Sequence, residues 1–162
     1  MAIKMITRVS AAAATVVCAV AFSTPADAAA AYQRFDNLGT GKCLAVPNAS
    51  KTAGTGLIQW TCGYGSEQQW KIEALPSGSV KITNENSQMC LAMPNSSLTN
   101  GTQAIQWPCN DNLDQRWIHD SANRLRNVNS DRCLAVANSD TTNGAEVIQW
   151  TCNTNSDQQW IW

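Results

Sequence analysis

The spacing of the cysteines is the clearest chemical pattern in this chain. Two cysteines 19 residues apart occur three times. Evenly paired cysteines in a chain with an export signal predict disulfides, whereas a metal site needs closer spacing, such as Cys-x-x-Cys, and usually several histidines. If the three repeats are equivalent, each bridge closes a loop of about 20 residues and contributes roughly 3 kcal/mol. The predicted disulfides are Cys43–Cys62, Cys90–Cys109 and Cys133–Cys152, and no metal centre is expected.

Residues that could perform acid–base catalysis are few. The only histidine, His119, adjoins Asp120 and Ser121, but a catalytic triad needs side chains that converge from separate elements. We interpret His119 as a surface residue. Hydrolysis of a glycosidic bond needs a positioned carboxylate pair, and no asymmetric pair stands out from the repeat. Neither a phosphate-binding loop nor an EF-hand spacing occurs, so the sequence predicts a protein that is not an enzyme and needs no cofactor.

The cysteine pairs belong to a longer internal repeat. Each copy carries Cys-Leu-Ala, then Ile-Gln-Trp-x-Cys, then Gln-x-Trp, and successive copies are displaced by 47 and 43 residues. Self-similarity of this period predicts structural units that stack on one another. Three copies favour a closed object with threefold pseudosymmetry over an open array. The copies span residues 42–70, 89–117 and 132–160.

The elements that must hold these residues are short strands. Runs of five to seven residues are separated by Gly, Asn, Ser and Pro, and no sustained helical period occurs, so the sequence predicts an all-β fold. Four strands in each of three repeats give twelve, and closing the sheet on itself would reduce the exposed edges. The expected strands are 31–37, 42–46, 56–62, 68–73, 79–84, 88–93, 102–107, 115–119, 123–129, 132–136, 145–151 and 158–162.

The predicted core follows from alternation and from the closing tryptophan of each repeat. Side chains two residues apart in the Cys-Leu-Ala strand share a face, and a buried tryptophan removes about 150–250 Å² from water. We expect the three tryptophans of Gln-x-Trp to meet near the axis. The predicted core residues are Leu44, Val46, Trp70, Leu91, Met93, Trp117, Leu134, Val136 and Trp160.

The first 28 residues resemble a secretory signal peptide rather than part of the fold. Lys4 and Arg8 give a basic start, residues 9–22 are apolar, and residues 26–28 fit a small-x-small cleavage site. The apolar run is too short for a membrane span. A lipoprotein anchor at Cys18 is the alternative, but Val17 before it is bulkier than the usual small residue. We therefore expect a secreted protein with a signal peptide of bacterial type.

Length and charge limit the remaining possibilities. Removing residues 1–28 leaves 134 residues, which predicts one domain at 29–162 with lobes at about 31–78, 79–122 and 123–162. The whole chain has a formal net charge of −1, and cleavage leaves it slightly more negative. A nucleic-acid partner is therefore not expected, since such partners need a basic face.

Three Gln-x-Trp motifs in register with three cysteine pairs resemble the ricin B-type lectin family over essentially the whole mature chain. The motifs are Gln68-Gln69-Trp70, Gln115-Arg116-Trp117 and Gln158-Gln159-Trp160. The resemblance implies a β-trefoil of three four-stranded repeats, a shallow sugar site on each lobe, and no catalysis. Members of the family are also classed as carbohydrate-binding modules.

The family's site residues carry over only in part. The family normally has an Asp two residues after the first cysteine, and this chain has Ala45, Ala92 and Ala135 there. A sugar site needs an apolar face for one side of the ring and polar groups for adjacent hydroxyls. In this chain the tryptophan of Ile-Gln-Trp, the acidic residue before Gln-x-Trp and the glutamine of that motif supply both. The carboxylate then stands on the wall of the pocket opposite the one that carries the Asp in the family. The candidate carbohydrate-binding residues are Trp60, Glu67, Gln68, Trp107, Asp114, Gln115, Trp150, Asp157 and Gln158.

Two alternatives stay open at this point. Ile58 and Trp60 could face inward and Gln59 outward, which would place Trp60 in the core and leave Gln59, Gln106 and Gln149 exposed. The three acidic residues could also be solvated turn residues or caps. The function expected is non-catalytic, multivalent glycan binding. The alternative is a protein-binding trefoil that has lost sugar binding: an adaptor or targeting subunit of a toxin or enzyme, or a protease inhibitor.

Overall fold

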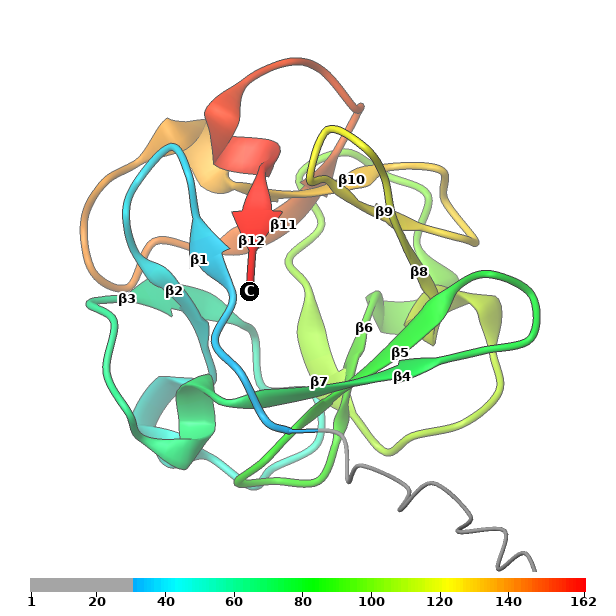
Figure 1. The fold of residues 1–162 in the computed structure, drawn as a ribbon, viewed down its shortest axis with the longest axis horizontal. Coiled ribbons are helices and arrows are strands. Elements are labelled where there is room, and N and C mark those ends of the chain that lie inside the picture. The colour runs from blue at the N-terminus through cyan, green and yellow to red at the C-terminus, as the bar shows by residue number, and fades with distance from the viewer. Residues whose placement is uncertain (1–30) are drawn as a thin grey trace, which may run out of the picture.

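The computed structural model describes residues 31–162, so the expected signal peptide at 1–28 lies outside the described residues. The described chain forms twelve strands and six short 3₁₀ turns, and its three lobes surround a common centre (Figure 1). The strands are β1 (Asp36–Asn37), β2 (Cys43–Ala45), β3 (Ile58–Trp60), β4 (Trp70–Ala74), β5 (Val80–Asn84), β6 (Cys90–Ala92), β7 (Ile105–Trp107), β8 (Trp117–His119), β9 (Leu125–Asn127), β10 (Cys133–Val136), β11 (Val147–Trp150) and β12 (Trp160–Ile161). The turns are η1 (Pro47–Ala49), η2 (Ser66–Gln68), η3 (Pro94–Ser96), η4 (Leu113–Gln115), η5 (Ala137–Ser139) and η6 (Ser156–Gln158).

Six strands close into a barrel. β4 pairs with β5, β5 with β8, β8 with β9, and β12 with β1, all antiparallel. Single bridges complete the circuit between Gln33 and Trp70 and between Arg124 and Gln159. The barrel therefore leaves no long unpaired edge.

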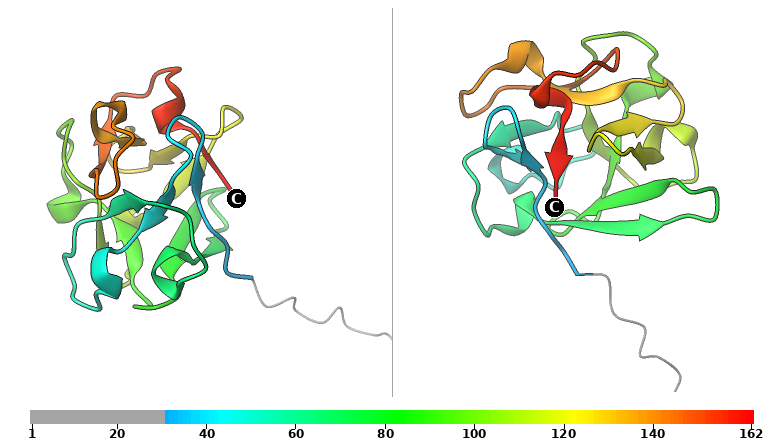
Figure 2. Two further views of the ribbon diagram at one scale, coloured as in Figure 1. Left: turned by 90° about the vertical axis from the view of Figure 1, so that its left-hand side faces the viewer. Right: turned by 45° about the horizontal axis from the view of Figure 1, so that its top comes forward.

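The other six strands form three hairpins that cover one end of the barrel. β2 pairs with β3, β6 with β7 and β10 with β11, and each hairpin is joined to the barrel through β1, β5 or β9. The hairpins also touch one another at the bridges Gly56–Ile105, Ile58–Glu146 and Gln103–Ile148. This arrangement, seen from two further directions in Figure 2, is a β-trefoil, as predicted.

The core contains every residue that the sequence assigned to it. All nine expected side chains are at most 1% exposed, together with Phe35, Leu57, Ile82 and Leu125. Each indole N–H of the Gln-x-Trp motif donates to the carbonyl oxygen of the leucine in Cys-Leu-Ala, from Trp70 to Leu44 at 3.1 Å. Trp117 and Trp160 make the same bond to Leu91 and Leu134 at 3.0 Å. The tryptophan thus joins the end of each repeat to its beginning without leaving a buried polar atom unpaired.

The cysteine pairing and the strand number agree with the expectations, whereas the strand lengths differ. The sulfurs of the pairs Cys43–Cys62, Cys90–Cys109 and Cys133–Cys152 are 2.06, 1.99 and 2.03 Å apart. Most strands are shorter than predicted. For β2, β6 and β10 the reason is that the chain turns into η1, η3 and η5 just after the Cys-Leu-Ala segment. The sequence predicts strands for the motif glutamines, but these residues lie in η2, η4 and η6. Within residues 31–162, none of the helical segments has the length and apolar character needed to cross a bilayer.

Candidate functional site

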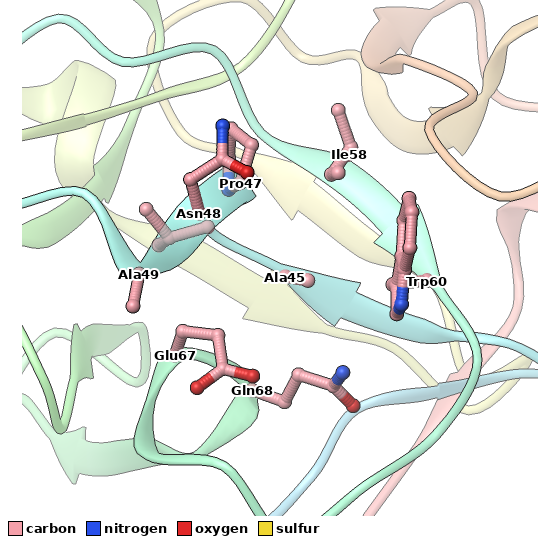
Figure 3. Close-up of a pocket in the computed structure, with 9 residues that line it drawn as sticks. Ala45, Pro47, Asn48, Ala49, Ile58, Trp60, Glu67 and Gln68 are labelled. Carbon is pink, nitrogen blue, oxygen red and sulfur yellow. The ribbon is translucent and has the colours of Figure 1, made fainter.

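Each lobe has one surface pocket, built from the same positions of the repeat. The pocket of lobe 1 lies between η1, η2 and the hairpin β2–β3, and Figure 3 shows its side chains. The pockets have volumes of about 540, 340 and 160 Å³ in lobes 1, 2 and 3. They share the residue that follows Cys-Leu-Ala (Val46, Met93 or Val136), an isoleucine, a tryptophan, an asparagine of the 3₁₀ turn and an acidic residue.

The tryptophan of Ile-Gln-Trp forms one wall of each pocket. Trp60, Trp107 and Trp150 are 47%, 44% and 44% exposed. The interpretation that placed these side chains in the core is therefore wrong. Each ring lines its pocket at the end of the outer strand of a hairpin.

The glutamine next to that tryptophan explains the orientation of the strand. Gln59, Gln106 and Gln149 are completely buried, not exposed as the alternative required. Gln59 Nε2 donates to the carbonyl oxygens of Asp140 and Thr142 at 2.6 and 2.9 Å, in the loop of lobe 3. Because neighbouring residues of a strand point to opposite faces, burying Gln59 turns Trp60 outward.

The same contact is repeated around the molecule. Gln106 Nε2 donates to the carbonyl oxygens of Ser50 and Thr52 in lobe 1, both at 2.9 Å. Gln149 Nε2 donates to Ser97 and Thr99 in lobe 2, at 2.8 and 2.9 Å. Each lobe therefore holds the loop of one neighbour, and we call these three glutamines the interlobe glutamines.

The loops held in this way also support the pocket tryptophans. Gly54, Gly101 and Gly144 have φ between 83° and 87°, a conformation that side chains strain. A Cβ at Gly144 would lie 3.9 Å from Cζ3 of Trp60, and a Cβ at Gly54 would lie 3.5 Å from Cζ3 of Trp107. The edge of each ring thus rests close to the backbone of the adjacent lobe.

In lobes 1 and 3 the alanine that stands where the family has Asp lines the pocket as its floor, whereas Ala92 is not part of the lining in lobe 2. Ala45, Ala92 and Ala135 are buried, at 1–2% exposed. In Figure 3, Trp60 stands on one side of Ala45, with Ala49 and Glu67 on the other. A methyl group on the floor contributes no hydrogen bond, so polar recognition has to come from the opposite wall.

The acidic residue before Gln-x-Trp lines all three pockets, but its exposure varies. Glu67 is half-buried, whereas Asp114 and Asp157 are only 7% exposed. Oδ1 of Asp114 accepts a hydrogen bond from the Ser96 hydroxyl at 3.3 Å. Oδ1 of Asp157 is buried and has no hydrogen-bond partner among the described residues. These side chains are part of the pocket walls rather than freely solvated turn residues.

The motif glutamines hydrogen-bond to backbone groups of the loop that precedes the second 3₁₀ turn of each lobe. Gln68 Oε1 accepts from the N–H of Gly63 at 2.9 Å, and Nε2 donates to the carbonyl oxygen of Thr61 at 3.1 Å. Gln115 and Gln158 make the equivalent pairs of bonds. Both ends of each amide are occupied, so the glutamine fixes the loop that carries the acidic residue.

The asparagine of the first 3₁₀ turn is a pocket residue that is not among the candidates predicted from the sequence. Asn48, Asn95 and Asn138 have φ of 53°, 51° and 54°, which asparagine tolerates better than most residues. Each is exposed and lines its pocket. Their fixed place, five residues after the first cysteine of every repeat, is the signal that could have revealed them.

Two features outside the pockets bear on metal and acid–base chemistry. Among residues 31–162 the grouping that could resemble a metal site is Asp36 with Cys43 and Cys62, but the two sulfurs form a disulfide and do not act as ligands. His119 is exposed and packs on Trp162, with ring centroids 4.0 Å apart. The acidic wall residues thus remain the chemically distinctive groups.

Comparison with solved structures shows where this fold occurs. The designed threefold-symmetric protein ThreeFoil is 32% identical, with a TM-score of 0.77 over 80% of this chain and 95% of that one. The Macrolepiota procera ricin B-like lectin, in complex with lactose, is 19% identical, with a TM-score of 0.68 over 85% and 96%. The exo-β-1,3-galactanase of Clostridium thermocellum is 23% identical, with a TM-score of 0.76 over 85% of this chain, which spans only 30% of the enzyme. The fold therefore also occurs as one part of a larger enzyme.

The length of the match to a family of known domains and the geometry of the repeats together identify the family of this chain. The ricin-type β-trefoil lectin domain matches residues 31–160, which is nearly all of the described chain. The three Gln-x-Trp tryptophans, the three disulfides and the three pockets lie within that span. This chain belongs to the ricin-type β-trefoil lectin family.

Proposed function

We propose that this protein is a secreted, non-catalytic lectin that binds glycans through the three pockets. The observation that carries the proposal is the half-exposed tryptophan and the acidic residue that line the same pocket in every lobe. The family supports carbohydrate binding in general, and the pocket geometry supports these residues in particular.

The chemistry of a pyranose ring fits this pair of walls. The C–H face of the sugar packs on the indole, and the carboxylate accepts hydrogen bonds from adjacent hydroxyls. Hydrogen bonds to an ionised acceptor are about twice as strong as those between neutral groups. In this proposal Trp60, Trp107 and Trp150 are the platforms, Glu67, Asp114 and Asp157 are the acceptors, and Gln68, Gln115 and Gln158 position the acceptors.

The charge of the pockets favours neutral sugars. Among the described residues, the lining of each pocket includes one carboxylate and no lysine, arginine or histidine. A sialic or uronic acid would bring a second negative charge into the pocket without a cation to pair it. Neutral glycans should therefore bind in preference to acidic ones.

Three pockets on one rigid domain favour multivalent binding. A weak site gains apparent affinity when a second site on the same domain reaches the same glycan-coated surface, because the second event is intramolecular. Three disulfides suit an oxidising environment outside the cell. We therefore propose a secreted protein that acts on surfaces or polysaccharides rather than on free monosaccharides.

A glycan array with the purified protein tests the proposal, followed by titration of the bound neutral sugars with tryptophan fluorescence as the signal. We expect neutral glycans to bind and to change the fluorescence. The triple variant Trp60→Ala, Trp107→Ala, Trp150→Ala should lose binding on the array. Trp162→Ala is the matched control, because Trp162 is 38% exposed and does not line the three pockets.

The acidic residues need their own test. Changing Glu67, Asp114 and Asp157 together to Ala should weaken binding at least tenfold, since each pocket loses charge-assisted hydrogen bonds. Unchanged binding in this variant would remove the acidic residues from the proposal while leaving the tryptophans in it.

The alanine floor favours a second candidate, a protein-binding trefoil. Ala45, Ala92 and Ala135 replace the polar residue that the family places in the sugar pocket. A domain of this kind would serve as an adaptor or targeting subunit, or as a protease inhibitor. It predicts an empty glycan array, no fluorescence change with sugars, and specific capture of a partner protein from the culture supernatant.

A further inference from the structure

The three pockets are built on one plan but differ in size by more than threefold. Their volumes are about 540 Å³ in lobe 1 and about 160 Å³ in lobe 3. Pockets for small organic ligands typically hold about 300–1,000 Å³, so lobe 1 lies inside this range and lobe 3 below it. Lobe 1 differs from lobe 3 at three positions around the pocket. Lobe 2 has Asn110, Asn112 and Asp114 at these positions, as lobe 3 does, and a pocket of about 340 Å³, so these residues account for part of the contrast.

The first difference is a pair of glycines in the loop before η2. Lobe 1 has Gly63 and Gly65 where lobe 3 has Asn153 and Asn155, and both asparagines line the small pocket. The backbone is the same at the second position, since Gly65 has φ −64° and Asn155 has φ −68°. The glycines are therefore not required by the turn, and their effect is to leave out two side chains.

The second difference is the acidic residue, whose longer side chain in lobe 1 uses the space that a glycine leaves free. A Cβ at Gly65 would lie 2.3 Å from both carboxylate oxygens of Glu67. The longer acid of lobe 1 thus places its carboxylate at the rim, in space that a side chain at position 65 would occupy. Asp157, one methylene shorter, is 7% exposed. The hydrogen-bond acceptor therefore lies at the rim in lobe 1 and deep in the wall in lobe 3.

We infer that lobe 1 binds an extended segment of a neutral glycan, at least two sugar units long, whereas lobe 3 binds a single terminal sugar. This inference rests on the proposed function. The first unit packs on Trp60, and the second lies beside Gly63, where no side chain stands, and bonds to the rim carboxylate of Glu67, which Gly65 accommodates. In lobe 3 the side chains of Asn153 and Asn155 occupy the equivalent room.

Isothermal titration of variants with one intact pocket tests this difference. Trp107→Ala with Trp150→Ala leaves lobe 1, and Trp60→Ala with Trp107→Ala leaves lobe 3. The probes are three neutral pairs: galactose and lactose, glucose and cellobiose, and N-acetylglucosamine and chitobiose. In the pair that binds, the disaccharide should bind lobe 1 about tenfold tighter than the monosaccharide, the equivalent of one or two additional hydrogen bonds. Lobe 3 should distinguish the two by less than about twofold.

Exchanging the three differing residues between the lobes provides the matched control. Gly63→Asn, Gly65→Asn and Glu67→Asp in the lobe 1 variant should abolish its preference for the disaccharide. Asn153→Gly, Asn155→Gly and Asp157→Glu in the lobe 3 variant should create one. The measured quantity is the ratio of the two affinities, so a general loss of affinity does not imitate the result, and circular dichroism verifies folding.

The outcomes separate this inference from the function on which it rests. Equal disaccharide preference in lobes 1 and 3, or a preference in lobe 1 that survives the exchange, overturns the inference while the lectin function stands. Absence of binding by the unmodified protein to all six sugars counts against the proposed function and against this inference with it.

Discussion

Each lobe contains two tryptophans in opposite environments, and the contrast separates the centre of the molecule from its surface. Trp70 is fully buried, and its indole N–H is bonded to the carbonyl oxygen of Leu44. Trp60, ten residues earlier, is 47% exposed at the wall of a pocket. Residue type alone therefore does not determine whether a tryptophan is buried here. The hydrogen bonds made by the neighbouring glutamine determine which way the tryptophan points.

The difference originates in what stands beside each ring. Gln59 is drawn inward by two carbonyl groups of another lobe, and this turns Trp60 outward. Gln68 instead bonds to its own loop, and the chain then enters β4 with Trp70 facing the core. One glutamine fixes a contact between lobes, and the other fixes a turn within a lobe.

The largest expected effect comes from truncating the two tryptophans separately. Trp70→Ala should lower the free energy of unfolding by about 3–5 kcal/mol, because it removes core volume and leaves the Leu44 carbonyl without its donor. Trp60→Ala should cost less than about 1 kcal/mol but should eliminate glycan binding in lobe 1. Urea unfolding and glycan titration measure the two quantities. Equal loss of stability in the two variants would contradict the contrast.

Removing one disulfide should produce the next largest effect. Cys43 pairs directly with Trp60 across β2 and β3, so the Cys43–Cys62 bridge holds the end of the strand that carries the pocket tryptophan. Replacing both cysteines by Ser should lower the free energy of unfolding by roughly 3 kcal/mol. Because all three bridges close loops of the same length, the three double variants should lose similar amounts. A much larger loss at one bridge would show that the lobes are not equivalent in stability.

The interlobe glutamines should show a smaller effect that differs between lobes. Gln59→Ala deprives two buried carbonyl oxygens of their donor and also breaks the bond from the Thr40 hydroxyl to Oε1, at 2.7 Å. Gln106 Oε1 is buried without a partner among the described residues. We expect a loss of about 2–3 kcal/mol for Gln59→Ala and about 1 kcal/mol less for Gln106→Ala. Thermal unfolding of the two variants measures the difference, and a greater loss for Gln106→Ala would count against it.

The smallest effect concerns pH and the turn between β8 and β9. Burial raises the pKa of Asp120, but hydrogen bonds from the Arg124 side chain and from the backbone N–H groups of Arg124 and Ala122 outweigh it, so the pKa lies below its usual value. This stabilisation is present above the ordinary pKa of aspartate and is lost as the pH falls through the lowered value. Because the ion pair with Arg124 is partly exposed, the contribution should stay below about 1 kcal/mol.

A matched variant isolates that contribution. Asp120→Asn should reduce stability near neutral pH and have little effect once the pH lies below the lowered pKa, where aspartate is protonated in both states. Glycan affinity at neutral pH should not change, since Asp120 lies between β8 and β9, away from the three pocket linings. A stability difference that persists in acid would assign the effect to packing instead of charge.

The sequence predicted the repeating frame because repetition makes equivalent residues visible. Twelve strands, three disulfides and a tryptophan core follow from spacing and alternation alone, and the structure confirms them. The orientation of Ile-Gln-Trp did not follow. A buried glutamine is unfavourable unless its amide is satisfied, and the carbonyl groups that satisfy Gln59 lie 81 and 83 residues away.

The unequal pockets were equally hidden in the sequence. Glu67 and Asp157 occupy one repeat position and carry the same charge, so they read as equivalent. Their depth depends on the loop residue two positions earlier. Gly65 leaves space for the Glu67 carboxylate, whereas the side chain of Asn155 lines the pocket beside Asp157. Such a difference appears only when the loop conformation is known.

The interlobe glutamines make each lobe depend on another for the support of its loop. Lobe 1 holds a loop of lobe 3, lobe 2 a loop of lobe 1 and lobe 3 a loop of lobe 2, so the contacts run around the molecule and return to their start. A single lobe separated from the other two would have a donor amide without an acceptor and a loop without a support.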